Sequence, residues 1–313
     1  MAQKSKQWAA IIMMIALFAM IAFVTNLCSP MATIVKNQFG ASELAGQIGN
    51  YANFIAYLVM GIPSGMLIAK LGYKKTALLA LIVGIVGIVF EYLSGVVGSY
   101  VIYLVGAFIS GLCMCMLNTV VNPLLNVLGG GGKTGNQLIQ IGGAANSAAA
   151  VAVYILMGAL IGEVTKSTGI SDATPALIIA GVIFVIAFVI LLFTKIEEPE
   201  QAKVELSLIT GALKFRQLSL GALAIFLYMS VEVGTPTYMI SYLQTPEVGL
   251  SAGVAGLIAS VYWLMMFVGR SIGGSIGGKV SSRAMVSTVA TAAIALLLFG
   301  IFAPETMKVT VIG

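Results

Sequence analysis

The stretch that decides the fold is GMLIAKLGYKK, residues Gly65–Lys75, because a related stretch, GSIGGKVSSR, returns at Gly274–Arg283. Each copy ends a long apolar run with small residues four positions apart, a spacing that lets two helix backbones approach closely in lipid. Each copy then presents cations where the chain would leave the membrane. An internal repeat on this scale in an apolar chain predicts two homologous halves. The corresponding positions are Gly65 and Gly274, Lys70 and Lys279, and Lys74 and Arg283.

Composition indicates that these halves lie in a membrane. The chain has 313 residues, of which 59% are hydrophobic and 9% charged, whereas a soluble domain carries about 25% charged residues. Lysine and arginine outnumber aspartate and glutamate by 16 to 11. These cations fall mostly between apolar runs, so they indicate membrane topology rather than a nucleic-acid surface. Three cysteines and no histidine favour packing roles over a disulfide framework or a metal site.

Nine apolar runs are long enough to cross a bilayer, which takes about 20 residues. If the sides alternate from a cytoplasmic amino terminus, the inside loops collect most of the cations, and only Lys36, Lys166 and Lys308 fall in outside loops. That asymmetry predicts a multi-pass protein whose N-terminus is cytoplasmic. The runs are Ala9–Val35, Leu44–Ala69, Ala77–Leu93, Tyr100–Val121, Leu138–Gly162, Pro175–Thr194, Leu218–Leu243, Ala252–Gly278 and Ala284–Phe302.

The longest polar stretch divides these runs into six and three. It covers residues 195–217 and is predicted to be a cytoplasmic linker whose charges form a solvated face. Residues 1–194 are predicted to form a six-helix bundle, and residues 218–313 to form a partial bundle of three helices and the start of a fourth. Because a half with three spans is incomplete beside a half with six, we expect a sequence that lacks its last three helices.

Several motifs resemble one family of membrane proteins. The loop Gly65–Lys75 and its repeat resemble the conserved loop of the major facilitator superfamily. The resemblance implies an all-α integral membrane bundle, here with nine of twelve transmembrane helices present. Five further motifs together resemble the fucose permease and glucose/galactose transporter family, which implies monosaccharide transport, proton coupling and the cytoplasmic (inner) membrane of a bacterium. These motifs are Thr25–Leu27, Asn118–Pro123, Asn146–Ser147, Tyr228–Val233 and Gly269–Arg270.

The departures from the family pattern concern its polar positions. In the loop an acidic residue usually precedes the first cation, but Ala69 and Gly278 stand at that position. The family's first-span aspartate falls at Ser29, its fourth-span glutamate or glutamine at Asn118, and its fifth-span glutamine at Gly143. Neither serine nor asparagine exchanges protons near neutral pH. The usual carriers for proton symport are therefore missing here, whereas an asparagine still suits sugar binding because it both donates and accepts hydrogen bonds.

Two ionisable side chains lie deep within predicted spans, where a charge is costly and indicates function by default. Glu232 lies near the middle of the run Leu218–Leu243 and is the candidate for substrate binding and for proton coupling. Arg270 lies in the cytoplasmic half of the next run. A structural Glu232–Arg270 ion pair that locks two helices is the alternative for both residues. Glu91, at the outer end of the third run, is interpreted as an interfacial residue.

Amide side chains gather in the first five runs and match the hydroxyl groups of a sugar. We predict that Asn26, Asn118 and Asn146 bind substrate together with Glu232. Tyr228 joins this set because it lies one helical turn before Glu232 and because its ring can stack on the apolar face of a sugar. For each single amide, a hydrogen bond to a neighbouring helix is the structural alternative.

Together these features predict a secondary transporter that moves a monosaccharide by alternating access, with the two repeated loops acting in the conformational switch. The alternatives are an uncoupled facilitator, a transporter of another small polar solute anchored by Arg270, and an inactive truncated fragment. The run Gly129–Gly135 lacks the spacing of a P-loop, and we do not expect an enzyme. The pattern implies the lipid bilayer, the solute and, in a symporter, a proton. It implies no cofactor, metal, nucleic acid or fixed protein partner.

Overall fold

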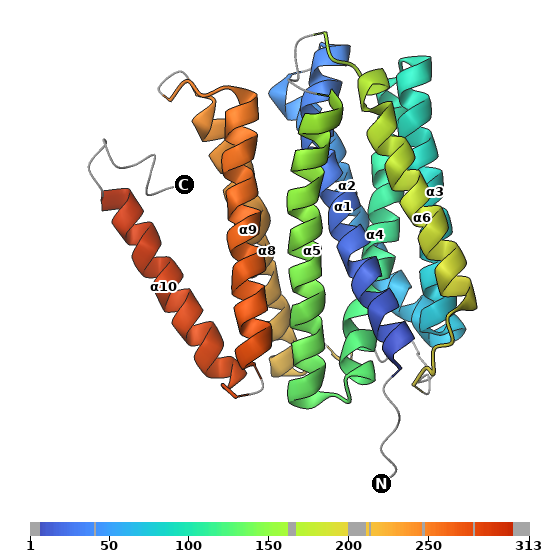
Figure 1. Ribbon diagram of the computed structural model, residues 1–313, viewed down its shortest axis with the longest axis vertical. Coiled ribbons are helices and arrows are strands. Elements are labelled where there is room, and N and C mark those ends of the chain that lie inside the picture. Colours follow the sequence, from blue (N-terminus) through green and yellow to red (C-terminus); the bar gives the residue numbers. More distant parts are fainter. Residues whose placement is uncertain are drawn as a thin grey trace. The chain divides into compact units, whose positions relative to one another are not determined.

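The computed structural model describes residues 7–40, 42–161, 167–199, 211–212, 214–245, 248–277 and 279–302, and every structural statement concerns these residues. They form long α-helices and one 3-10 turn, η1 (Ile170–Ala173), with no strand among them (Figure 1). The long helices are α1 (Trp8–Phe39), α2 (Glu43–Leu71), α3 (Tyr73–Val97), α4 (Tyr100–Leu128), α5 (Gly132–Ile161), α6 (Thr174–Phe193), α8 (Arg216–Leu243), α9 (Ala252–Ile276) and α10 (Ser282–Phe302).

The nine predicted spans are confirmed in the described part of the chain, where nine helices are long and apolar enough to cross a membrane. The largest difference from prediction is at the end of α4, which continues to Leu128 rather than ending at Val121. The next largest is at α5, which begins at Gly132 rather than at Leu138. Hydropathy marks the apolar part of a helix and misses a polar first turn.

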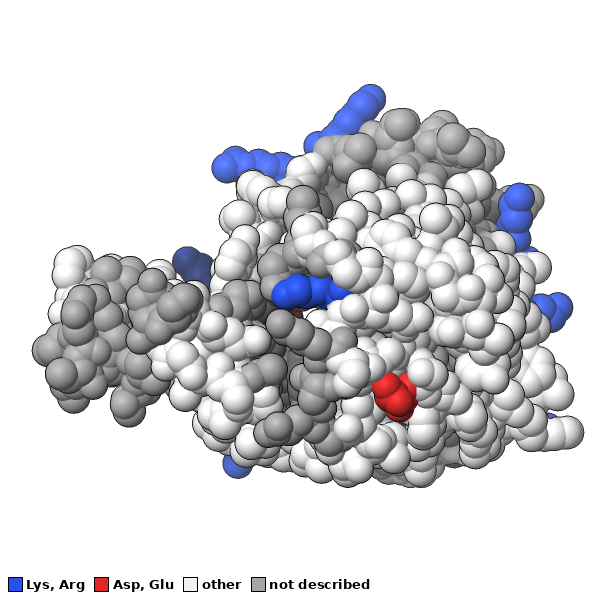
Figure 2. All heavy atoms as spheres, turned by 90° about the horizontal axis from the view of Figure 1, so that it is seen from above, with Lys and Arg blue, Asp and Glu red and all other residues white. Residues whose placement is uncertain are grey.

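Figure 2 shows a face with few charged side chains, which are scattered rather than gathered into a patch. Some of the predictions made from sequence fall on residues outside the described part of the chain. These are residues 200–210, 213 and 303–313, Lys166, Gly278 and the side chain of Ser29.

Local sequence explains where several helices begin and end. The Ser42 hydroxyl accepts a hydrogen bond from the Ala45 N–H at 3.2 Å and so caps the start of α2. Ser99 caps α4 in the same way. Gly40 ends α1 with a φ of 57° and Gly98 ends α3 with a φ of 69°. Glycine suits both positions because other residues are strained in this left-handed conformation.

The chain divides into two compact units. The first contains α1 to α6 together with the part of α9 from Trp263 onwards. The second contains α8, the part of α9 up to Tyr262, and α10. In the second unit a small apolar cluster joins α8 to its part of α9; its buried members are Met239, Leu243, Ala255 and Ala259.

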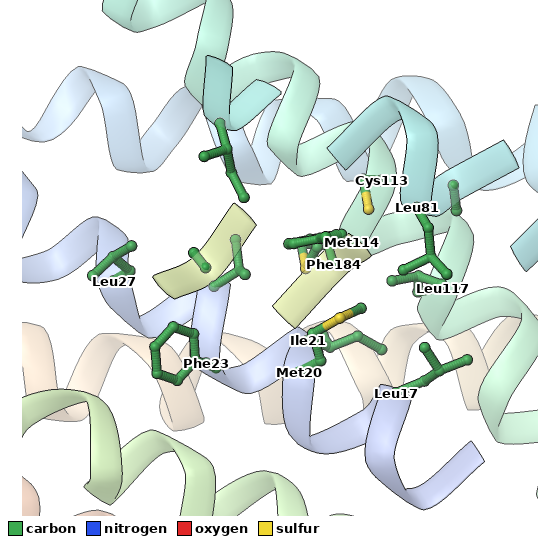
Figure 3. Packing of buried hydrophobic residues seen from close by; sticks show 14 of the residues in the cluster. Leu17, Met20, Ile21, Phe23, Leu27, Leu81, Cys113, Met114, Leu117 and Phe184 are labelled. Atoms are coloured by element: carbon green, nitrogen blue, oxygen red, sulfur yellow. The ribbon is translucent and has the colours of Figure 1, made fainter. Parts of the chain in front are cut away.

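The core of the first unit is built around α4, which packs against α1, α2, α3 and α5. Figure 3 shows side chains from α1, α3, α4 and α6 converging there, with Phe184 of α6 beside Met114 of α4. Cys113 lies in the same cluster, and Cys28, Cys113 and Cys115 are all buried and free. Cys113 therefore has the packing role that the sequence predicts, and the other two cysteines are buried outside this cluster.

A close approach of α2 and α4 depends on Gly111. A Cβ atom at this position would lie 2.7 Å from the Ala56 Cβ and 2.8 Å from the Asn53 Cα. Because one of these atoms belongs to the backbone of α2, no side-chain rotation relieves the overlap. We expect Gly111→Ala to lower the free energy of unfolding by about 1–3 kcal/mol, the usual cost of overpacking. The measurement is thermal unfolding in detergent, detected through the reaction of a thiol-reactive dye with the buried cysteines as they become exposed.

The matched control for this prediction is Gly61→Ala in α2. A Cβ atom at Gly61 has no other atom within 4 Å, so alanine gains helix propensity there without an overlap. We expect the unfolding temperature to fall for Gly111→Ala and not for Gly61→Ala. Equal shifts for both variants would show that the helices do not meet at Gly111.

Candidate functional site

A chain of polar side chains joins α2 to α4. The Asn118 amide donates from Nδ2 to the Tyr57 hydroxyl at 2.9 Å. One helical turn later, the Asn122 amide donates to the Asn118 carbonyl oxygen at 3.1 Å and lies 3.4 Å from its Oδ1. All three side chains are half-buried. This arrangement places one ring and two amides together, each with hydrogen-bonding capacity for hydroxyl groups.

Asn26, the third amide predicted to bind substrate in the first unit, bonds within its own helix. Its Nδ2 donates to the Ala22 carbonyl in α1 at 2.8 Å, and the side chain is 8% exposed. The observed bond of Asn26 therefore lies within α1 and differs from the bond to a neighbouring helix that was the structural alternative for single amides. Its role in binding substrate stays a prediction.

A second polar group joins α5 to α1 and to the part of α9 in the first unit. The Asn146 Nδ2 donates to the Phe18 carbonyl in α1 at 2.9 Å. The Arg270 guanidinium donates from Nη1 to the Gly143 carbonyl at 3.0 Å, to the Ser147 hydroxyl at 3.0 Å and to the Asn146 Oδ1 at 3.4 Å. Arg270 thus contacts three neutral oxygens of α5. Its predicted ion pair with Glu232 stays a prediction.

Glu232 and Tyr228 lie in α8, in the second unit. Glu232 is half-buried just past the middle of the helix, and its carbonyl oxygen accepts a hydrogen bond from the Tyr262 hydroxyl of α9 at 3.1 Å. Tyr228, one turn earlier, is 53% exposed. The structure therefore confirms that Glu232 lies within a long apolar helix. The substrate-binding role of both residues stays a prediction.

Glu91 corrects the interpretation made from sequence. It is 6% exposed in α3, and its Oε1 accepts a hydrogen bond from the Ser110 hydroxyl of α4 at 2.8 Å. Interfacial placement was wrong because the depth of a residue along a helix does not say which face it occupies. The glycines at 87 and 106 bring α3 and α4 so close that Cβ atoms there would overlap Ser110 and Glu91. The first unit therefore holds a buried carboxyl group that hydropathy did not reveal.

The first copy of the repeated loop is held by an acidic residue from elsewhere in the chain. Glu198, beyond the end of α6, accepts hydrogen bonds from the backbone N–H groups of Tyr73 at 2.7 Å and Lys74 at 2.8 Å. The Lys74 ammonium in turn donates to the carbonyl oxygens of Leu192 at 2.9 Å and Thr194 at 2.8 Å. A carboxylate thus lies at the N-terminus of α3 and a cation at the C-terminus of α6, both favoured by the helix dipoles.

Gly72 makes room for this contact. Its φ is 85°, and a Cβ atom at this position would overlap the Glu198 carboxylate. From the sequence, the charges of residues 195–217 were interpreted as a solvated face. For Glu198 that interpretation was wrong, because its carboxylate bonds the loop. In the same loop, Gly65 and Lys70 are exposed. The loop therefore has no acidic side chain at Ala69, but Glu198 places a carboxylate about one helical turn later, at Tyr73 and Lys74.

We expect Glu198→Ala to destabilise the first unit by about 1 kcal/mol, because it removes a carboxylate that caps two N–H groups at a helix N-terminus. Glu197→Ala is the matched control, since it removes the same charge from the exposed neighbouring side chain. The measurement is thermal unfolding in detergent at low and high salt. A shift of the same size in both variants would contradict a specific role for Glu198.

The second copy of the loop begins at the end of α9. The Gly274 carbonyl accepts a hydrogen bond from the Gln137 side chain of α5 at 3.3 Å, within the first unit. Lys279 and Arg283 are exposed. The two copies therefore differ in their surroundings, since the contact of the first copy runs to Glu198 and that of the second to α5. No group of three potential metal ligands of the His, Cys, Asp or Glu type occurs in the described part of the chain.

The described part of the chain is a bundle of long apolar helices with amides, a hydroxyl and a cation between them, an architecture typical of multi-pass membrane proteins. The chain belongs to the Major Facilitator Superfamily, whose family model matches residues 12–312. The resemblance inferred from the loop and the short motifs is therefore confirmed. Its named relatives are transporters rather than enzymes.

Relatives in three bacteria carry sugar-transporter names. The chain is 25% identical over 263 residues to the glucose/galactose transporter of Brucella abortus biovar 1 (strain 9-941), which covers 82% of this chain. It is 22% identical over 314 residues to the L-fucose-proton symporter of Escherichia coli (strain K12), with 92% of this chain and 72% of the relative covered. A putative glucose/galactose transporter of Helicobacter pylori (strain J99 / ATCC 700824) is 26% identical over 280 residues, with 86% and 68% covered. The chain spans 64% of the length of the Brucella relative.

Solved structures show the same fold. The crystal structure of the Escherichia coli fucose:proton symporter matches with a TM-score of 0.81 at 20% identity, covering 98% of this chain and 80% of that one. A structure of a superfamily transporter named FucP, in the outward conformation, matches with a TM-score of 0.83 at 19% identity, with the same coverage. These likenesses establish the fold of the described helices.

Proposed function

We propose that the chain moves a monosaccharide across the cytoplasmic membrane of a bacterium by alternating access. The observation that carries this proposal is the half-buried group of Tyr57, Asn118 and Asn122 between α2 and α4. Supporting it are the relatives, which are named transporters of glucose, galactose and L-fucose.

The chemistry of these side chains suits a neutral polyhydroxylated ligand. An amide offers two donors and an acceptor, so one asparagine can bind two neighbouring hydroxyl groups of a sugar. The Tyr57 ring adds an apolar surface beside Asn118. Arg270 donates to three neutral oxygens of α5, a role that does not require an anionic solute. These features favour a sugar over the organic anion considered as an alternative.

We further propose the domain division and topology that the sequence predicts. Residues 1–194 form the N-terminal six-helix bundle, residues 195–217 the cytoplasmic linker and residues 218–313 part of the C-terminal bundle. The N-terminus lies in the cytoplasm, because that orientation places most lysines and arginines inside. The two repeated loops then lie on the cytoplasmic side.

For proton coupling we propose Glu232, because it is a half-buried carboxyl group within a membrane-spanning helix. One observation favours an uncoupled facilitator as the second candidate. Ser29 and Asn118 stand where the family pattern has acidic or amide side chains, and neither exchanges a proton near neutral pH.

The test is uptake of radiolabelled D-glucose, D-galactose and L-fucose into proteoliposomes, with and without an inward proton gradient. Accumulation above equilibrium only with the gradient supports the proposed symporter. Equilibration without accumulation supports the facilitator. Binding and uptake of none of the three sugars, by a chain that unfolds cooperatively in the same detergent, would overturn the proposed function.

A further inference from the structure

Arg270 contacts one face of a single turn of α5. Its three acceptors belong to Gly143, Asn146 and Ser147, which are three and four residues apart and therefore lie on the same side of the helix. Ser147 is fully buried, and Arg270 is half-buried. The guanidinium is thus fixed against α5 by several hydrogen bonds with a charged donor, which are stronger than bonds between neutral groups.

Gly143 provides the space for this side chain. A Cβ atom at position 143 would lie 3.2 Å from the Arg270 Cδ, 3.5 Å from its Nε and 3.7 Å from its Nη1. An alanine there would already press on the arginine, and any longer side chain would need the volume that the guanidinium occupies. The identity of residue 143 therefore decides whether Arg270 can reach α5.

The contact with Arg270 also determines how the Asn146 amide is oriented. An arginine only donates hydrogen bonds, so the atom of Asn146 that faces it must be the carbonyl oxygen. The NH2 group then faces the Phe18 carbonyl of α1, to which it donates at 2.9 Å. One N–H and one lone pair of this amide remain for a ligand. Without Arg270 the amide could rotate and present the wrong group to a sugar hydroxyl.

The packing of α9 on α5 continues towards the end of α9. A Cβ atom at Gly274 would lie 3.6 Å from the Gln140 Cβ, and the Gln137 side chain donates to the Gly274 carbonyl. Residue 143 of α5 contacts residue 270 of α9, and residue 137 of α5 contacts residue 274 of α9. The two helices therefore run in opposite directions at this contact. Arg270 and Gly274, one helical turn apart on α9, therefore both contact α5.

We infer that Arg270 is a positioning residue, which holds α9 on α5 and thereby fixes the Asn146 amide for a neutral sugar, and that Gly143 is the position that permits it. This inference rests on the proposed function only for the identity of the ligand.

The first experiment needs no sugar. Cysteines placed at Gln140 and Gly274, in a background without the three native cysteines, have the Cβ separation of a disulfide, which is about 3.5–4.5 Å. We expect oxidation to link them rapidly, and Arg270→Ala and Gly143→Gln to slow the linkage about 10-fold. Gly158→Gln is the matched control on α5, because a Cβ atom at Gly158 has no other atom within 4 Å. Linkage at an unchanged rate in Arg270→Ala would overturn the inference.

The second experiment is a double-mutant cycle on binding of D-glucose, D-galactose or L-fucose, whichever the unaltered chain binds. Arg270→Ala and Asn146→Ala are each expected to weaken binding about 10-fold. If Arg270 acts through Asn146, the double variant binds no more weakly than Asn146→Ala alone. Independent losses that multiply would overturn the positioning role. If the unaltered chain binds none of these sugars, the proposed function fails, and the linkage experiment alone decides the inference.

Discussion

Replacing Asn118 with leucine is expected to lower the efficiency of monosaccharide uptake about 10-fold to 100-fold. Leucine has as many heavy atoms as asparagine and the same branching at Cγ, so the substitution removes the amide and still fills the space between α2 and α4. The Tyr57 hydroxyl then loses its 2.9 Å donor, and Asn122 loses a nearby acceptor. A buried polar group left without a partner costs about 1–3 kcal/mol, in addition to any bond that Asn118 makes with the sugar.

The measurement is the initial rate of uptake over a range of sugar concentrations, with the amount of folded protein determined for each variant. Tyr57→Phe removes only the hydroxyl and should have a smaller effect in the same direction. Asn126→Leu is the matched control on the same helix, since its amide is also half-buried but bonds the exposed Asn136 near the end of α4, away from Tyr57. Equal losses for Asn118→Leu and Asn126→Leu would show that the amide group between α2 and α4 has no special role.

The spans could be predicted from sequence because a membrane helix needs a long apolar run and its hydrogen bonds are local. The same local chemistry predicts several boundaries: Ser42 and Ser99 cap helices, and Gly40 and Gly98 end them. The i and i+4 spacing of Asn118 and Asn122 also places both amides on one face of α4. Each of these features depends on residues close together in the chain.

What the sequence could not show are contacts between distant segments. Glu198 bonds Tyr73 across 125 positions, and Asn146 bonds Phe18 across 128. Periodicity carries no information about such pairs. Glu91 illustrates the same limit, because its depth was readable but its Ser110 partner on α4 was not. Arg270 was singled out correctly as a residue within a span, yet its contacts with α5 depend on a glycine at 143, whose meaning appears only when the two helices are seen together.

Replacing Glu232 with glutamine is expected to abolish accumulation of sugar against its gradient while leaving sugar exchange across the membrane. Glutamine keeps the shape of the side chain and its hydrogen-bonding capacity, but it cannot take up and release a proton. If Glu232 carries the proton, the variant still alternates between its two states with sugar bound, and only the coupling to the gradient is lost. Accumulation and exchange are both measured in proteoliposomes, with the proton gradient imposed for the first and absent for the second.

Glu91→Gln is the matched control, because the described helices place both glutamates within membrane-spanning segments, one in each unit. The oxygen of glutamine at position 91 can still accept the bond from Ser110, so we expect both accumulation and exchange to persist. Loss of accumulation in Glu91→Gln with retention in Glu232→Gln would assign coupling to the buried carboxyl between α3 and α4 instead. Accumulation retained in both variants would show that neither carboxyl group is needed for coupling. Loss of exchange in Glu232→Gln would mean that this side chain binds the sugar itself, since a residue used only for coupling is not needed when sugar moves down its own gradient.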